Sequence, residues 1–151
     1  MIQFLKDITG VTARADAQER ARAKAQHAAR LAQARKVGEF QVVQEDRKLF
    51  HYQLFLTPST LDGSWFYLGS YGHICSRANA HSFSSLEEAK AAGAAAGAQC
   101  RERIAGEMER QQQFRNIYAP PEFLAKSVNA FKSSEDLLIE VAQAVSQRYQ
   151  R

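Results

Sequence analysis

The alternation of side chains between residues 49 and 56 is the clearest pattern in the chain. One alternating set is Phe50, Tyr52, Leu54 and Leu56, and the other is Leu49, His51, Gln53 and Phe55. A two-residue period predicts a β-strand. Shorter apolar runs at 40–43, 65–68, 71–75 and 80–83 predict further strands, separated by a charged turn at 45–48 and a loop at 58–63. Because the connections are too short for crossover helices, we expect an antiparallel sheet of three to four strands.

Helical patterns precede this sheet. Residues 1–8 have the spacing of a short helix, which the Thr9-Gly10 pair should interrupt. Residues 13–36 then hold ten alanines and neither glycine nor proline, which predicts a long helix. Its only large aliphatic side chain is Leu31, so it should gain little from packing on a core. We therefore expect residues 1–38 to form a helical arm that projects, dimerises or packs.

Helical patterns also follow the sheet. Ser84 and Ser85 each precede a glutamate by three residues, so a capping box predicts the start of a helix that runs from about Leu86 to Gln113. Its expected inner face is Leu86, Ala89, Gly93, Ala96, Cys100, Ile104 and Met108. Glycines at 93 and 97 suit close packing of this helix on the sheet. A short helix at 123–131 and a last helix, capped by Ser133 or Ser134, should complete a single α+β domain of residues 1–151.

The aromatic residues concentrate in the predicted sheet. Between Leu49 and Leu86 lie eight of the fifteen aromatic residues, whereas Asp62 and Arg77 are the only charged ones. Most of these rings should form the core under the long helix. The opposite sheet face is also apolar, so we expect a cover there: the first helix, a second protomer or a target. The candidate protein-interface residues, chosen because such types are enriched at binding hot spots, are Trp65, Tyr67, Tyr71, Phe55 and His51.

The net charge of +4 originates in the first helix. Its cations, which could contact nucleic-acid phosphates, are Arg14, Arg20, Arg22, Lys24, Arg30, Arg35 and Lys36. They wind around the helix, however, and no aromatic residue lies between them to stack on bases. A solvated helix or one docked on an acidic protein is the other interpretation. The alanine stripe at 17, 21, 25, 28 and 32 would allow two copies to approach, so we also predict a homodimer.

Catalytic and metal-binding signatures are weak. His73, Cys75, His81 and Cys100 could ligate a metal by type, but their spacing matches no specific zinc arrangement. Ser70 and His73 flank Gly72, and a hydrolytic dyad with His51 across the sheet is conceivable, but a turn or bulge at 69–72 explains these residues more simply. We predict no catalytic residue, metal or cofactor, and no disulfide framework from two cysteines.

No run approaches the roughly 20 apolar residues of a membrane span, and residues 1–7 have the wrong length and flanks for a signal peptide. We expect a cytoplasmic protein without membrane contact. These features favour a non-enzymatic module that acts through protein–protein interaction, of the kind that phages and plasmids use as small inhibitors or accessory proteins. A nucleic-acid-associated protein is the alternative; an enzyme or a virion-structural role ranks lower.

Overall fold

The computed structural model describes residues 2–59, 62–118 and 133–151. The chain divides into two compact units, unit 1 (Met1–Arg30) and unit 2 (Leu31–Arg151). Helix α1 (Ile2–Lys36) crosses the boundary between them. Each unit is therefore described by itself.

Unit 1 consists of the first 30 residues, in which α1 runs without interruption from Ile2. The expected break at Thr9-Gly10 is wrong. A single glycine in a helix interior costs only about 1 kcal/mol relative to alanine, and no proline or left-handed residue accompanies it. All side chains from Gly10 to Arg30 are exposed except that of His27, which is half-buried.

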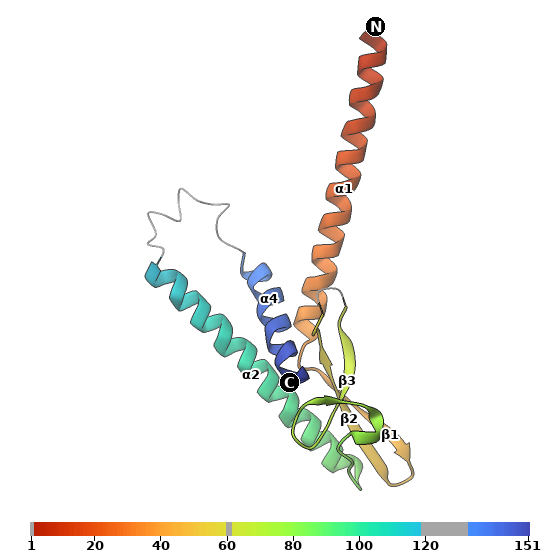
Figure 1. Cartoon of the computed structure of the whole chain (residues 1–151), viewed down its shortest axis with the longest axis vertical. Helices are drawn as coiled ribbons and strands as arrows, with labels where there is room; N and C mark the ends of the chain where they lie inside the picture. Colours follow the sequence, from red (N-terminus) through yellow and green to blue (C-terminus); the bar gives the residue numbers. More distant parts are fainter. Residues whose placement is uncertain (1, 60–61, 119–132) are drawn as a thin grey trace. The chain divides into compact units, whose positions relative to one another are not determined.

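Unit 2 contains a four-stranded sheet of β1 (Phe40–Asp46), β2 (Leu49–Leu56), β3 (Ser64–Leu68) and β4 (Ile74–Cys75). The strands follow one another in chain order, and every neighbouring pair is antiparallel, as predicted (Figure 1). The turn at 45–48 is shorter than expected, because β1 continues to Asp46. The strand expected at 80–83 is reduced to one bridge between Phe50 and Phe83, after the short helix η1 (Arg77–Asn79).

Helix α2 (Leu86–Tyr118) packs on the sheet, as predicted. Ser85 provides its N-cap, since its Oγ accepts a hydrogen bond from the Glu88 N–H (3.2 Å). A Cβ at Gly93 would collide with the Phe40 ring, and one at Gly97 with the Gly38 carbonyl, so both glycines are needed for this approach. Leu86 was wrongly placed on the inner face: as the first helical residue it is 40% exposed. The helix also extends past Gln113.

Helix α4 (Ser134–Gln147) lies beside α2 and is followed by η2 (Arg148–Gln150) (Figure 1). The Ser133 hydroxyl caps α4 by accepting from the Asp136 N–H (3.2 Å). Within the core, Ser146 Oγ accepts from the Thr57 N–H (3.0 Å), which ties α4 to the end of β2. The helix predicted at 123–131 lies outside the described residues.

The core of unit 2 joins the sheet, α2, α4 and the last turns of α1. Its largest fully buried side chains are Leu54, Leu56, Leu68, Cys100, Val141, Val145 and Ser146. Leu31, Ala34 and Val37 are also buried, so the end of the first helix packs within unit 2 and does not belong to a free arm. Gly38, with φ +90°, ends the helix, and its N–H donates to the Phe55 carbonyl (3.0 Å).

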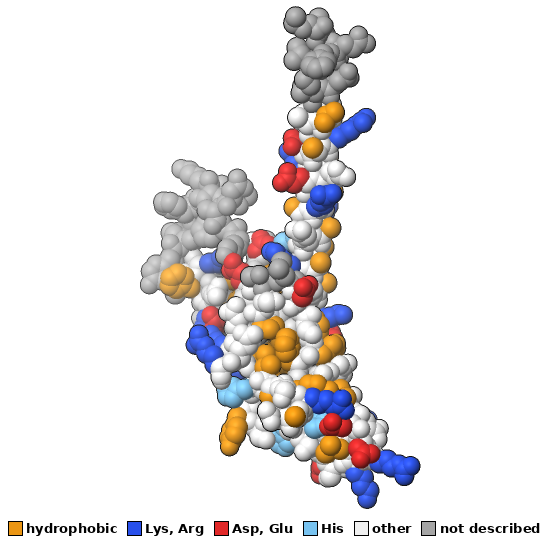
Figure 2. Space-filling view, turned by 45° about the vertical axis from the view of Figure 1, so that its right-hand side comes forward, with side chains coloured by type: hydrophobic (Ala, Val, Ile, Leu, Met, Phe, Trp, Pro, Cys, Tyr) orange, Lys and Arg blue, Asp and Glu red, His pale blue; other side chains and the backbone are white. Residues whose placement is uncertain are grey.

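The sheet face opposite α2 is covered partly by the chain's own side chains. His51 and Phe55 are 3% and 7% exposed. The Phe55 ring meets the Trp65 ring edge-on, with centroids 5.4 Å apart, and Lys36 Nζ lies 5.9 Å from its centroid. These two residues are therefore covered within the chain, and Lys36 of the first helix, one of the covers expected, contributes at Phe55. Figure 2 shows one face of the molecule, where hydrophobic side chains gather in the middle of unit 2.

Candidate binding pocket

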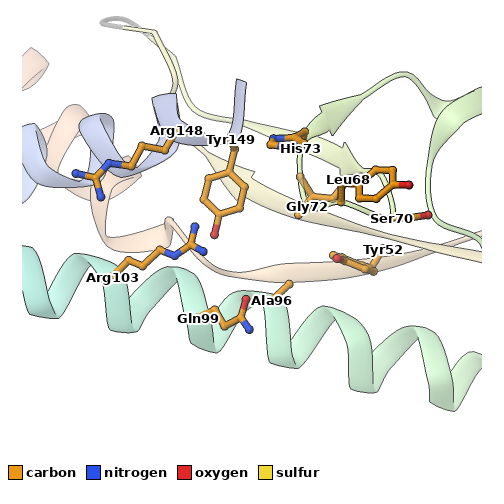
Figure 3. Close-up of a pocket in the computed structure, with 11 residues that line it drawn as sticks. Tyr52, Leu68, Ser70, Gly72, His73, Ala96, Gln99, Arg103, Arg148 and Tyr149 are labelled. Carbon is orange, nitrogen blue, oxygen red and sulfur yellow. The ribbon is translucent and has the colours of Figure 1, made fainter. Parts of the chain in front are cut away.

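A pocket of about 360 Å³ lies in unit 2 between the sheet, α2 and the C-terminal end of the chain (Figure 3). β2, β3, the β3–β4 hairpin, α2 and η2 all contribute to its lining. The lining residues are Tyr52, Leu68, Ser70, Tyr71, Gly72, His73, Ala96, Gln99, Arg103, Arg148 and Tyr149. Polar side chains face it from several elements, while Leu68 and Ala96 supply an apolar part of the wall. We call it the arginine–tyrosine pocket.

The β3–β4 hairpin forms one rim of this pocket. The Gly72 N–H donates to the Gly69 carbonyl (2.9 Å) and the Gly69 N–H to the His73 carbonyl (3.0 Å). Gly72 has φ +77°, a conformation that suits glycine and follows the turn in many hairpin loops. The turn leaves Tyr71 92% exposed at the tip. A turn at 69–72 was expected, and its hydrogen bonds replace the first half of the strand predicted at 71–75.

The opposite wall carries the cationic groups. Ala96, Gln99 and Arg103 lie on one face of α2 because their spacing is three and four residues. The Arg103 guanidinium lies over the Tyr149 ring, 5.6 Å from its centroid. Tyr149 itself is only 6% exposed. Arg148, at the start of η2, reaches within 4.0 Å of the Glu107 carboxylate.

Burial affects three ionisable groups at or beside the pocket, Tyr149, Tyr52 and Cys100. Burial raises the pKa of Tyr149 well above its usual value, and the neighbouring Cys100 raises it further. Burial likewise raises the pKa of Tyr52. It also raises the pKa of Cys100, although the hydrogen bond with Tyr149 and the nearby arginines partly oppose this. These groups therefore add no negative charge to balance the arginines.

Four of the five candidate interface residues lie together on one sheet face, where the ring of His51 meets Tyr67 and that of Phe55 meets Trp65. Trp65 and Tyr67 are half-buried on β3, whereas His51 and Phe55 are buried on the same sheet face. Tyr71 alone of the five lines the arginine–tyrosine pocket.

The basic residues of α1 divide between the two units. Arg14, Arg20, Arg22, Lys24 and Arg30 are exposed in unit 1, where Figure 2 shows basic side chains at several levels of the helix. Arg35 and Lys36 belong to unit 2. There Arg35 lies 4.0 Å from Glu135, and Lys36 lies over Phe55.

The four side chains considered above as possible metal ligands lie in different surroundings. The His81 ring stacks on Phe83 with centroids 4.5 Å apart, and Cys75 Sγ donates to the Tyr67 carbonyl (3.7 Å). Cys100 is buried beside Tyr149, and His73 lines the pocket. Across the described ranges, no three His, Cys, Asp or Glu side chains gather as a metal site would require.

The hydrolytic dyad considered above does not form in the described part of the chain. Ser70 and His73 line the same pocket, but no hydrogen bond between their side chains occurs there. His51 is engaged elsewhere: its Nδ1 donates to the His81 carbonyl (3.0 Å), and its Nε2 lies 2.6 Å from Glu45 Oε2.

Sequence reasoning missed Gln99, Arg103, Arg148 and Tyr149. The helical spacing of Ala96, Gln99 and Arg103 was a usable signal, since it places a polar pair beside the small-residue face of α2. No local signal could show that η2 returns to this face, because the contact joins residues about 45 positions apart.

Comparisons with known proteins add no assignment: no protein-family model, no curated protein and no solved structure matches this chain. None of the helices in the described segments has an apolar stretch long enough to span a bilayer.

Proposed function

We propose that this chain is a non-catalytic binding module that meets a protein partner at the tip of the β3–β4 hairpin. The observation that carries the proposal is Tyr71, which is 92% exposed beside the arginine–tyrosine pocket. Tyrosine is enriched among residues that dominate binding energy, and a pocket beside it gives a partner side chain a place to enter.

The geometry of the hairpin supports this role. Two backbone hydrogen bonds close the turn around Ser70 and Tyr71. A turn held in this way loses little backbone entropy when a partner binds, so more of the contact energy becomes affinity. Among the other exposed apolar side chains of the described residues, Val11 and Phe114 are less exposed than Tyr71. Phe114 also lines a pocket with arginines, but that lining comes from α2 alone, whereas several elements line the pocket at Tyr71.

Site-specific photocross-linking tests the proposal. Tyr71 is replaced by a photoreactive phenylalanine derivative in the full chain, which is expressed in its native host. We expect a discrete protein adduct that survives nuclease and that excess unmodified protein prevents. The same derivative at Phe114, an exposed aromatic position on α2, is the control and should not give this adduct. Absence of an adduct at Tyr71, or the same adducts from both positions, would contradict the proposal.

A second candidate, nucleic-acid binding, is favoured by one observation: five cations of unit 1 are exposed on a continuous helix. If they contact phosphates, affinity should fall steeply with salt concentration. Charge reversal of Arg20, Arg22, Lys24 and Arg30 should then abolish binding. We rank this second because the cations surround the helix and do not form one stripe.

Three finer features remain part of the proposal: a cytoplasmic location, a homodimer, and a phage- or plasmid-type inhibitory role. The alanine stripe of α1 supports the homodimer, since small side chains allow close helix approach. Light scattering at several salt concentrations tests it. A dimer that tightens as salt screens the like-charged helices is expected, and a monomer at every salt concentration would refute it.

A further inference from the structure

The arginine–tyrosine pocket has more positive than negative charge. Arg103 and Arg148 line it, and no aspartate or glutamate does. Glu107 is the carboxylate that approaches Arg148, but Arg110 binds the same oxygen at 2.9 Å. Among the residues that the structure describes, Arg103 forms no ion pair, and its recorded partner is the ring of Tyr149. The Glu107 carboxylate is therefore shared by Arg110 and Arg148, whereas Arg103 has no carboxylate partner among the described residues.

Tyr149 prepares Arg103 to bind an anion. The Arg103 Cζ lies 5.6 Å from the centroid of the Tyr149 ring, and a cation–π contact of this kind uses no hydrogen-bond acceptor, so the guanidinium N–H donors stay available to a ligand. The ring is buried and cannot follow the arginine into solvent. In Figure 3 the Arg103 side chain rises from α2 and ends beside Tyr149, and Gln99 extends from the same side of α2. Both side chains place hydrogen-bond donors at this wall.

The neutral part of the lining limits the type of anion. Ala96 and the Tyr52 ring, both half-buried, offer apolar surface, and a volume of about 360 Å³ exceeds what an inorganic ion fills. The occupant that fits has a charged end for the guanidinium and a carbon body for this surface. Arginine binds carboxylates through paired N–H donors, which matches a carboxylate at Arg103.

We propose that the pocket binds a carboxylate of the protein partner, either an acidic side chain or a chain terminus, with its oxygens on Arg103 and its carbon body against Ala96 and the Tyr52 ring. This inference rests on the proposed function, because it takes the hairpin tip as the place where the partner arrives. It adds the chemistry of the recognised group.

Nuclear magnetic resonance titration of the full chain with three small probes tests the pocket directly. The probes are N-acetylphenylalanine, which carries a terminal carboxylate, N-acetylglutamate α-amide, which carries a side-chain carboxylate, and N-acetylphenylalanine amide, which carries none. We expect at least one acid to bind at least tenfold more tightly than the amide, with shifts at Gly72 and the Gln99 side-chain amide. The better acid identifies the source of the carboxylate.

Two matched variants locate the charge. Arg103→Gln should weaken the acid roughly ten- to a hundredfold, since it removes a charge-assisted hydrogen-bonding group. Arg47→Gln removes the same charge at the exposed β1–β2 turn, away from the pocket lining, and should change affinity less than twofold. Equal binding of acids and amide, binding of none, or equal losses in both variants would overturn the inference.

The cross-linking experiment separates this inference from the proposed function. Arg103→Gln in the chain that carries the photoreactive group at position 71 should greatly reduce the adduct. An undiminished adduct would refute the carboxylate while the protein-binding function stands. Acid binding without any adduct at position 71 would instead refute the protein partner.

Discussion

Two polar clusters in unit 2 differ in whether their charged side chains have partners. In the first, Glu45 Oε2 lies 2.6 Å from His51 Nε2, and Glu45 Oε1 lies 3.0 Å from Arg77 Nε. The other ring nitrogen of His51 donates to the His81 carbonyl, so this cluster is complete. In the second, the arginine–tyrosine pocket, Arg103 lies beside the Tyr149 ring and has no carboxylate partner among the described residues.

The difference separates a structural role from a binding role. A buried polar group with all its partners present holds its surroundings together, and removing one partner leaves the others unsatisfied. The first cluster joins β1, β2 and the segment after β4 in this way. A cation beside a cavity, without a counter-charge, contributes little to folding and is available to a ligand. The sequence made His51 a candidate interface residue, but its contacts indicate that it stabilises the fold.

The largest expected effect on stability comes from breaking the complete cluster. His51→Ala removes a side chain that is 3% exposed and takes away the histidine partner of Glu45 Oε2 and of the His81 carbonyl, while Glu45 Oε1 keeps Arg77. We expect the free energy of unfolding to fall by about 2–4 kcal/mol in a urea titration. Acid-probe affinity should change less than twofold. A loss below about 1 kcal/mol would show that the cluster is not structural.

Gly93→Leu should affect both the stability of the protein and acid binding, because α2 packs on β1 through this glycine and also forms the pocket wall. Overpacking against Phe40 should cost about 1–3 kcal/mol of unfolding free energy, measured by urea titration. The shift of α2 should also weaken the acid probe. Ala94→Leu, at the next and exposed position, is the control and should change neither property. Equal behaviour of the two variants would disprove this contact.

The alkaline stability of the protein should depend on Tyr149. Its pKa is raised in the folded state from an ordinary value of 10.0, so folding favours the neutral phenol. This contribution is complete below pH 10 and decreases as the pH rises above it. Between pH 9 and 11, wild type should therefore lose about 1 kcal/mol more than Tyr149→Phe. Urea titrations at each pH measure the difference, and parallel pH profiles would refute it.

The smallest expected effect on stability is that of Arg103→Gln. Since this arginine is exposed and forms no ion pair among the described residues, its replacement should change the unfolding free energy by no more than about 0.5 kcal/mol. Arg47→Gln should behave alike. A loss above about 1 kcal/mol would mean that the contact with Tyr149 stabilises the fold, and the contrast between the clusters would then disappear.

Sequence periodicity predicted the elements better than it predicted the pocket. The alternation at 49–56 and the small-residue face with Gly93 and Gly97 gave β2 and the packing of α2 correctly. Leu86 and Gly10 were misjudged because helix ends and single glycines depend on context beyond the local pattern. The pocket needs η2 to return over α2, and the neighbours of Arg103 and Tyr149 follow from that tertiary contact.

The position of Trp65 determines what fluorescence can report about this protein. It is the only tryptophan in the sequence, and it packs edge-on against Phe55 in unit 2. Its emission should follow the loss of the sheet but not fraying of the first 30 residues, which contribute only helical circular dichroism. Unfolding curves from tryptophan fluorescence and circular dichroism can therefore differ even when unit 2 has no folding intermediate. For the whole chain, agreement between these two curves is not a valid test of two-state unfolding.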